Sequence, residues 1–371
     1  MIECCELVNI RRATSFSLLD ECLSRGQWSP AVVDFPGYCH EFPCRHRCPQ
    51  TGARALSVWR SDRSAACATL LPTQHNSTYG HALNQATELF LVGDSVTWQI
   101  ATTLRWAATH NPHLARLRVV SCFMSVIPRL SRAIDDALQD CLAQGSGGGR
   151  VATPPGRRII VVNVGLWYQP TPWCAPVHMQ ESPGCLCCKH AALNETHPDS
   201  THRPAAYTWN EGSVYNAMRR FTGTSIGGDY GRDVRNLASA LGRLRAVGVK
   251  ALWLSSTPQH FPPFGPYDVA ELRIPTYDEQ PQNHREGRPS FNGTCLNEVP
   301  PKPEIRNDLA LPIVREFGIP TLNLWEALRR RGDMHKGHDC THWCEPGDAV
   351  WLMANAVLGG ASLVTARPAL S

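Results

Sequence analysis

The sequence predicts an α/β fold, a three-layer sandwich in which helices cover both faces of a mostly parallel, five-stranded sheet. Continuous apolar runs, rather than runs that alternate with polar residues, are typical of strands buried on both faces of such a sheet. Segments with helical spacing separate these runs, and the alternation favours a doubly wound order of strands and helices. The predicted strands are residues 88–93, 117–123, 158–165, 249–256 and 319–325.

Apolar stripes with helical spacing predict the helices that pack on this sheet. One stripe follows the first strand, and another precedes the fourth. They consist of Val96, Ile100 and Leu104, and of Val234, Leu237, Leu241 and Leu244. Residues 350–366 are apolar as well, but their Asn, Ser and Gly residues favour a final packed helix over a membrane span.

The composition bounds the class of protein. With 371 residues, 43% of them hydrophobic, the chain can form one large domain, or one domain with a small appendage. Its 36 basic and 32 acidic residues leave a formal net charge of +4. This balance argues against a protein dedicated to binding nucleic acid. The start of the chain shows no basic segment followed by a long apolar one, so neither a signal peptide nor a membrane anchor is visible.

The expected organisation has four parts. They are an N-terminal extension (1–21), a cysteine-rich entry segment (22–87), the main α/β domain (88–358) and a C-terminal tail (359–371). Within the main domain, two long polar insertions, residues 168–212 and 258–304, follow the third and fourth strands. Long loops of this kind often build binding surfaces, so we expect a polar, open cleft rather than an apolar tunnel.

Sixteen cysteines are unusual for a chain of this length. Many lie in polar, loop-like contexts, and three N-x-S/T sequons, at Asn76, Asn194 and Asn292, occur in similar places. Together they favour disulfide bonds and an oxidising secretory compartment.

A zinc site is the alternative use of some of these cysteines. The candidate ligands are Cys185, Cys187 and Cys188 with His178, His190 and His197. Their spacing is irregular and lacks a pair of C-x-x-C motifs, so disulfides are favoured. We therefore expect neither a metal nor a resident cofactor.

Two short motifs far apart in the chain supply the parts of a catalytic triad. A G-D-S tripeptide ending at Ser95 follows the first strand directly, and Asp339 and His342 form a D-x-x-H unit near the C-terminus. On a turn or a first helical turn, that spacing lets the carboxylate reach the imidazole Nδ1. The pattern predicts acyl transfer through Ser95, with His342 as general base and Asp339 orienting it. In the alternative interpretation, Asp94 and Ser95 cap a helix, and His342 and Trp343 are packed core aromatics.

An acyl-transfer site also needs donors for the oxyanion of its tetrahedral intermediate. The candidates are the backbone N–H of Ser95, at a helix N-terminus, and the side-chain amide of Asn163 at the end of the third strand. Both positions open onto the carboxyl edge of the predicted sheet, where active sites of open α/β sheets lie. The alternative for Asn163 is an amide that bonds to neighbouring loops.

At these residues the chain resembles the trichome birefringence-like polysaccharide O-acetyltransferases, of the PC-esterase branch of the SGNH/GDSL hydrolase fold. The resemblance rests on the G-D-S tripeptide and, above all, on the D-C-x-H-W-C-x-P-G string from Asp339 to Gly347. An N-x-G-x-W string from Asn163 to Trp167 and a weaker Cys-Gly-Trp pattern near residue 22 add to it. The similarity covers about residues 22–358.

The resemblance implies an enzyme that transfers an acetyl group from a donor of unknown identity to a hydroxyl of a cell-wall-type polysaccharide or glycan. It also implies a secretory location, in the Golgi lumen or membrane, with secretion as the alternative. A disulfide between Cys295 and Cys340 follows from it. For Cys344 we expect a partner in the N-terminal group of Cys39, Cys44 and Cys48.

Three further residues are candidates for substrate binding. Trp167 and Trp343 are placed to stack on a sugar, although buried Trp residues more often belong to the core. His260 is placed to line the acceptor cleft, and its alternative is a loop histidine bonded to the backbone. Two other functions remain open: a secreted SGNH carbohydrate or lipid esterase with the same triad, and a non-catalytic glycan-binding relative.

Overall fold

The computed structural model places a large part of the chain around a central sheet. The described residues are 16–30, 57–61, 67, 70–71, 83, 87–124, 127–128, 131–145, 154–165, 227–260, 295, 298–299, 305–336, 339–345 and 347–365. All statements about the structure below concern these residues.

Five parallel strands form the central sheet, as the sequence predicts. They are β3 (Thr87–Gly93), β4 (Leu117–Phe123), β5 (Arg158–Asn163), β6 (Lys250–Leu254) and β7 (Thr321–Leu322). Their order is β4-β3-β5-β6-β7, and every neighbouring pair is parallel. The strands β3 and β5 are almost completely buried, which explains why their sequences are apolar without alternation.

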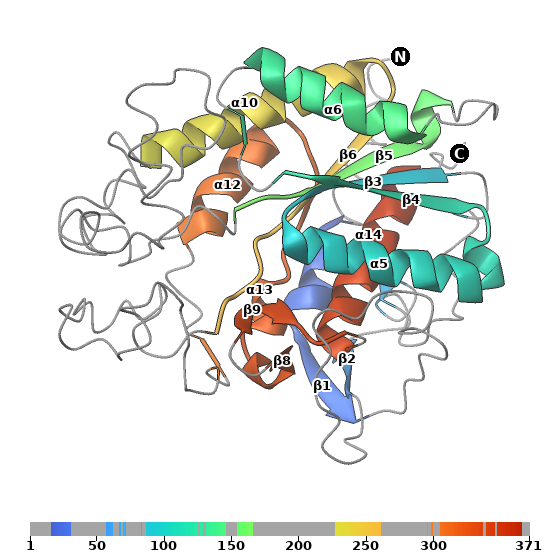
Figure 1. Cartoon of the computed structure of the whole chain (residues 1–371). Helices are drawn as coiled ribbons and strands as arrows, with labels where there is room; N and C mark the ends of the chain where they lie inside the picture. The colour runs from blue at the N-terminus through green and yellow to red at the C-terminus, as the bar shows by residue number, and fades with distance from the viewer. Residues whose placement is uncertain are drawn as a thin grey trace, which may run out of the picture.

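Helices cover both faces of this sheet (Figure 1). On one face lie α5 (Ser95–His110) and α14 (Asp348–Thr365), and on the other lie α6 (Ser131–Gly145), α10 (Gly227–Ala246) and α12 (Ile305–Glu316). Each face has its own apolar core. The predicted stripes on α5 and α10 point into these two cores, so both helix predictions are confirmed.

Short elements join these parts. They are η1 (Pro112–Leu114), η2 (Pro155–Arg157), α13 (Trp325–Leu328), η6 (Gly332–Met334), β8 (His335–Lys336) and β9 (Asp339–Trp343). β8 and β9 pair antiparallel, with an irregular register between His335 and Lys336.

The strand order places a topological switch point between β3 and β5. After β3 the chain adds β4 on one side, and then returns to add β5 on the other side of β3. Ligands of open α/β sheets bind at such a point, beyond the carboxyl ends of the strands. Gly93 and Asn163, the last residues of β3 and β5, are paired in register there. The fold therefore brings Ser95 and Asn163 to one edge.

Two glycines allow the close packing at this edge. A Cβ on Gly93 would lie 2.0 Å from the main-chain oxygen of Asn163, well inside van der Waals contact. Gly165 has a φ of +147°, and a Cβ there would lie 2.2 Å from the hydroxyl of Ser256. Any larger residue would push these segments apart. This accounts for Gly93 in the G-D-S tripeptide and for Gly165 in the N-x-G-x-W string.

The N-terminal segment packs into the same core as α5 and α14. Residues 16–24 are helical, and they are followed by an antiparallel pair, β1 (Gly26–Pro30) and β2 (Ser57–Ser61). A disulfide joins Cys22 to Cys67, and Trp59 Nε1 donates to the carbonyl of Cys22. Because the helix runs through residues 21 and 22, the expected boundary at that point falls inside an element.

The C-terminal helix α14 is a core helix in its packing. By length and composition it would suffice to cross a membrane, but 83% of its apolar window is buried inside the protein. It contacts α5 and β6 on the sheet. The predicted packed helix is thus observed, and it continues to Thr365, past the boundary expected after residue 358.

Three disulfides lie between described cysteines. Besides the Cys22–Cys67 bond, Cys122 on β4 is joined to Cys141 on α6, and Cys295 is joined to Cys340 on β9. The last bond is the one that the family resemblance implies. Cys344 is disulfide-bonded too, and its partner lies outside the described residues.

Charged residues hold the opposite, amino edge of the sheet. Glu88 on β3 is buried, and its carboxylate lies 3.2 Å from Arg118 on β4 and 3.3 Å from Arg158 on β5. The register of the two parallel pairings puts both arginines directly opposite Glu88. The ion pairs therefore tie three neighbouring strands together at their amino ends.

Candidate active site

Ser95 and His342 are in direct contact at the carboxyl edge of the sheet. The hydroxyl Oγ of Ser95 lies 2.6 Å from Nε2 of His342, although 247 residues separate them in the chain. Both side chains are partly exposed, so the pair is accessible to a substrate. This contact is the geometry that a serine nucleophile and its general base require.

The start of α5 places Ser95. Asp94 is the N-cap of the helix, and its carboxylate accepts from the backbone N–H of Val96 at 3.0 Å. Within the described residues, the backbone N–H of Ser95 itself has no hydrogen-bond acceptor. It lies in the first turn, where the helix dipole favours negative charge. This N–H is therefore suited to the predicted oxyanion role.

A short strand, rather than a turn, carries His342. Residues 339 to 343 form β9, whereas the sequence interpretation put the D-x-x-H unit on a turn or first helical turn. Pairing with β8 is what extends this segment. The side chain of Asp339 lies outside the described residues, so its contact with His342 stays a prediction. Because Nε2 of His342 faces Ser95, a carboxylate that orients this ring would contact Nδ1.

A buried glutamine that the sequence interpretation missed locks β9 onto α5. Gln99 lies one helical turn after Ser95 and is completely buried. Its Nε2 donates to the carbonyl of Trp343 at 2.7 Å, and its Oε1 accepts from the N–H of Trp343 at 3.1 Å. The residue next to His342 is thus held by the helix that begins with Ser95. The sequence did contain a sign of this role, because Gln99 places an amide in the buried, apolar part of a helix, where it needs hydrogen-bond partners.

The segment after β6 holds β9 from the other side. The backbone N–H of His260 donates to the carbonyl of Cys340 at 2.9 Å, and Gln259 donates to the hydroxyl of Thr341 at 2.8 Å. The Cys295–Cys340 disulfide adds a covalent link to the same strand. These contacts restrain β9 without using the side chain of His342.

Asn163 joins strand ends instead of facing an open site. Its Nδ2 donates to the carbonyls of Leu254 and Ser255, at 3.2 and 2.7 Å, and its Oδ1 accepts from the hydroxyl of Thr97. Both hydrogens of the amide therefore have acceptors, and the side chain is buried. In this arrangement Asn163 has no free N–H for an oxyanion. The contacts match the alternative interpretation, an amide bonded to neighbouring loops.

Two buried charges lie behind Ser95. Burial raises the pKa of Asp94 to about 6, although the N–H groups of Val96 and Thr97 and the charges of Arg306 and His342 act in the opposite direction. Burial also lowers the pKa of the Arg306 guanidinium on α12 to about 10. This guanidinium stays protonated at neutral pH and is a positive charge acting on Asp94 from within the protein.

The candidate substrate residues occupy different positions. Trp343 has no exposed surface and stacks on His335, so it belongs to the core and not to a sugar platform. His260 is completely buried and bonded to the carbonyl of Arg329, so the prediction that it lines the cleft is wrong. Trp167 lies outside the described residues, as do most of the two insertions expected to form the cleft.

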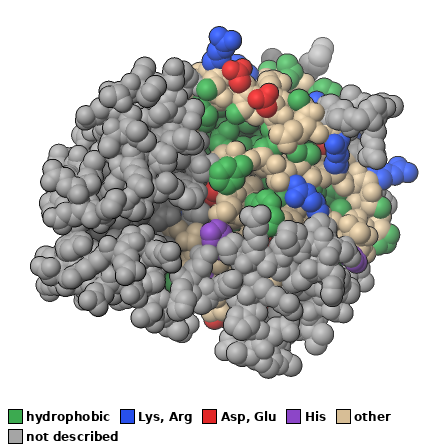
Figure 2. Space-filling view, viewed as in Figure 1, with side chains coloured by type: hydrophobic (Ala, Val, Ile, Leu, Met, Phe, Trp, Pro, Cys, Tyr) green, Lys and Arg blue, Asp and Glu red, His purple; other side chains and the backbone are tan. Residues whose placement is uncertain are grey.

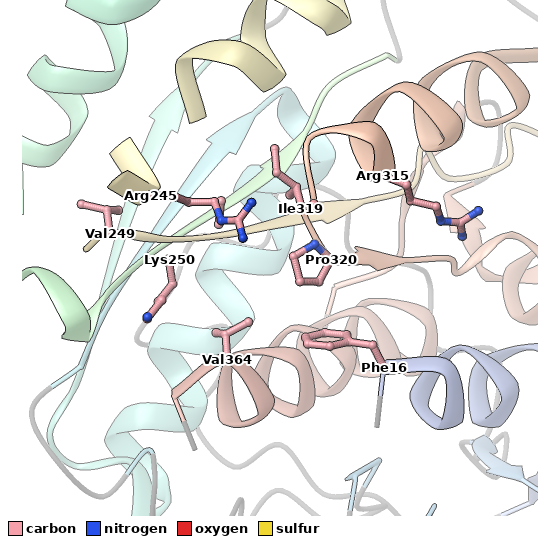
Figure 3. Close-up of a pocket in the computed structure, with 10 residues that line it drawn as sticks. Phe16, Arg245, Val249, Lys250, Arg315, Ile319, Pro320 and Val364 are labelled. Carbon is pink, nitrogen blue, oxygen red and sulfur yellow. The ribbon is translucent and has the colours of Figure 1, made fainter. Parts of the chain in front are cut away.

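A cavity of about 390 Å³ lies at the amino edge of the sheet, away from Ser95 (Figure 3). It is lined in part by Arg245, Lys250 and Arg315. Arg245 donates to the carbonyl of Phe317, and Arg315 donates to Thr321 and pairs with Asp20 at 3.8 Å. In Figure 3 the three cationic groups point in different directions. They therefore do not converge on one ligand.

The described surface carries charges of both signs. On the face shown in Figure 2, its basic and acidic side chains are scattered among apolar and uncharged atoms. This distribution gives that part of the surface no continuous basic stripe for nucleic acid.

No family model matches the chain, and no curated protein matches it.

Proposed function

We propose that this protein is a serine-dependent O-acetyltransferase that moves an acetyl group to a hydroxyl of a polysaccharide or glycan. One observation carries the proposal, the 2.6 Å contact between Ser95 Oγ and His342 Nε2 at the switch point of a parallel sheet. The motifs around these two residues resemble those of the trichome birefringence-like family, and the strand order is compatible with the SGNH-like sandwich of that family.

The first half-reaction forms an acyl-enzyme. Ser95 Oγ attacks the carbonyl carbon of the acetyl donor while His342 Nε2 takes the hydroxyl proton. The backbone N–H of Ser95 stabilises the oxyanion, and the proposed contact with Asp339 stabilises the imidazolium. The intermediate then collapses, the donor's leaving group departs with the proton from His342, and the acetyl group stays on Ser95.

The second half-reaction transfers the acetyl group. A sugar hydroxyl attacks the acyl carbon, and His342 takes the proton of that hydroxyl. Collapse breaks the bond to Ser95 Oγ, which recovers its proton from His342. The product is an acetyl ester of the glycan, and the enzyme returns to its starting state.

Hydrolysis is the second candidate, because water can resolve the same acyl-enzyme. A secreted carbohydrate or lipid esterase would use the Ser95–His342 contact in the same way. A non-catalytic glycan-binding role would not need a hydroxyl and an imidazole nitrogen held 2.6 Å apart, so this observation favours an enzyme. The long polar insertions favour a large, polar acceptor over a lipid chain.

A secretory location fits this proposal. Disulfides persist in oxidising compartments, and those of this protein join its strands, helices and entry segment. We therefore propose a location in the secretory pathway, in the Golgi or, as the alternative, outside the cell after secretion.

A transfer assay tests the proposal. The protein is incubated with an acetyl donor carrying a labelled acetyl group, with and without oligosaccharide acceptors, and the label is followed by mass spectrometry. Label on the oligosaccharide supports the transferase, and release of free acetate alone supports the esterase. Absence of both, with several donors, contradicts an enzymatic role.

A further inference from the structure

Two buried histidines form a chain of contacts that ends on the backbone of His342. His260 Nε2 lies 3.0 Å from the carbonyl oxygen of Arg329, and His260 Nδ1 lies 2.8 Å from His335 Nε2. On the far side, His335 Nδ1 lies 2.8 Å from the carbonyl oxygen of His342. His260 is completely buried and His335 is 5% exposed, so water does not supply alternative partners freely.

These three contacts need three N–H groups. Both carbonyl oxygens are acceptors, so the nitrogens that face them must each carry a proton. The contact between the two rings requires one more. Two neutral imidazoles have only two N–H groups in total. The geometry is satisfied only when the pair carries one additional proton, and hence one positive charge.

We propose that the His260–His335 pair holds one extra proton, and that this proton positions His342 by fixing its main-chain carbonyl. The inference rests on the proposed function for its catalytic consequence, but not for the protonation itself. His260 and His335 act as positioning residues, because neither is placed to touch the substrate.

The surroundings assign the charge to His335. Burial lowers the pKa of His260 to about 4, so this ring is the neutral member, with its proton on Nε2 facing Arg329. His335 then donates from both nitrogens as an imidazolium. Its ring stacks on Trp343 with centroids 4.1 Å apart, an arrangement that favours a cation over the indole face.

Most charged groups around the His260–His335 pair form ion pairs with groups of opposite charge. Asp333 on η6 acts on His260 in the direction that favours its charged form. Arg331, which follows α13, pairs with Asp333 and with Asp348 at the start of α14. Arg329, at the end of α13, pairs with Glu298 and Glu326, so its own charge is balanced.

Deprotonation would break the chain of contacts. With only two N–H groups left, one of the three contacts places two lone pairs against each other, so it must open. The three contacts are complete only with the extra proton bound, so this positioning effect is present at low pH and is lost as pH rises and the proton leaves. The expected result is a loss of turnover on the alkaline side.

The protonation is tested directly by NMR of the histidine rings in the uniformly ¹⁵N-labelled full chain, with His335 assigned by its absence in the His335→Asn variant. We expect near pH 6 one ring protonated at both nitrogens, His335, and a second ring, His260, protonated at Nε2 alone. Raising the pH should remove the proton from His335 and shift the signals of the His342 ring at the same pH. Two neutral buried rings near pH 6 would overturn the proposal, whether or not the protein has acyltransferase activity.

A matched set of variants tests the consequence. In His335→Asn the amide nitrogen takes the place of Nδ1 and can still donate to His342, without titrating, so the alkaline loss of kcat should disappear. In His335→Gln the amide reaches toward His260 instead, and kcat should fall about tenfold or more across the pH range. The control is His110→Gln, because His110 also stacks on a tryptophan and contacts a carbonyl, 2.9 Å from Trp106 O, but lies at the far end of α5. Its pH profile should equal that of the parent, and an alkaline loss that persists in His335→Asn would contradict the positioning role.

Discussion

The two edges of the central sheet are held together by different chemistry. At the amino edge, Glu88 forms ion pairs with Arg118 and Arg158 across three strands. At the carboxyl edge, buried carboxamides bind main-chain groups instead. They are Gln99 on Trp343, Asn163 on Leu254 and Ser255, and Asn307 on Ser256.

The difference indicates how a reactive pair is positioned. A carboxamide both donates and accepts, so it can hold a backbone segment without adding a charge. The amino edge carries no reactive pair among its described residues, and there ion pairs hold the strands together. The edges therefore separate stability from positioning.

The largest expected effect comes from removing the proposed general base. His342→Ala should lower kcat/KM at least about a hundredfold, the usual scale of general acid–base catalysis, and Asp339→Asn should do the same. Steady-state kinetics with an activated acetyl ester measures both, and circular dichroism checks that the fold is retained. Turnover near that of the parent in either variant would return that residue to a structural role.

The buried charge of Asp94 gives a pH-dependent effect on stability. Because burial raises the pKa of Asp94 from 3.8 to about 6, the folded state binds the proton more tightly than the unfolded state. Stability is therefore lost as pH rises from about 4 through 6, by up to about 3 kcal/mol. Asp94→Asn should remove this dependence. In urea unfolding, the free energy of unfolding of the variant should therefore rise relative to that of the parent as the pH increases from 4 to 7. Parallel pH curves for the two proteins would show that the carboxylate is stabilised where it lies.

A substitution of Asn163 distinguishes a structural role from a role as oxyanion donor. Asn163→Asp places carboxylate oxygens against the carbonyls of Leu254 and Ser255, so the free energy of unfolding should fall by roughly 2 kcal/mol. If the amide instead serves the oxyanion, the variant would lose about a hundredfold in kcat with little change in stability. Unfolding and kinetics on the same sample separate the two roles.

Substitutions of Gln99 and Glu88 compare the carboxyl edge of the sheet with the amino edge. Gln99→Leu removes two hydrogen bonds to Trp343 and should cost about 2 kcal/mol of stability and about tenfold in kcat, because β9 is then free to shift. Glu88→Gln should cost a similar stability, roughly 2 kcal/mol, and leave kcat unchanged. Equal losses of kcat in the two variants would contradict the separation of the edges.

Much of the fold follows from the sequence because its strands are buried on both faces. The run that ends at Gly93 is apolar at almost every position, and the observed strand β3 covers it. The Ser95–His342 pair follows too, since one motif ends a strand and the other lies in a distinctive string.

The remaining features depend on partners that are distant in the sequence. The ring of His260 is buried against His335, which lies 75 residues later, and no local sequence pattern predicts that contact. Likewise, β9 is a strand because β8 pairs with it, whereas its spacing alone suggested a turn. Gln99 looked like an ordinary member of a helix, because its partner, Trp343, lies 244 residues away. Local periodicity records which face is buried, but not which polar groups meet there.

The most direct measurement concerns the acyl-enzyme itself. The protein is mixed with an activated acetyl ester, quenched in acid, digested and analysed by mass spectrometry, in parallel with the Ser95→Ala variant. The proposed mechanism predicts a single acetyl adduct on the peptide that contains Ser95, absent from the variant, and lost when an oligosaccharide acceptor is added before the quench. An unchanged adduct in Ser95→Ala, or its location on another residue, would contradict the assignment of Ser95 as the nucleophile.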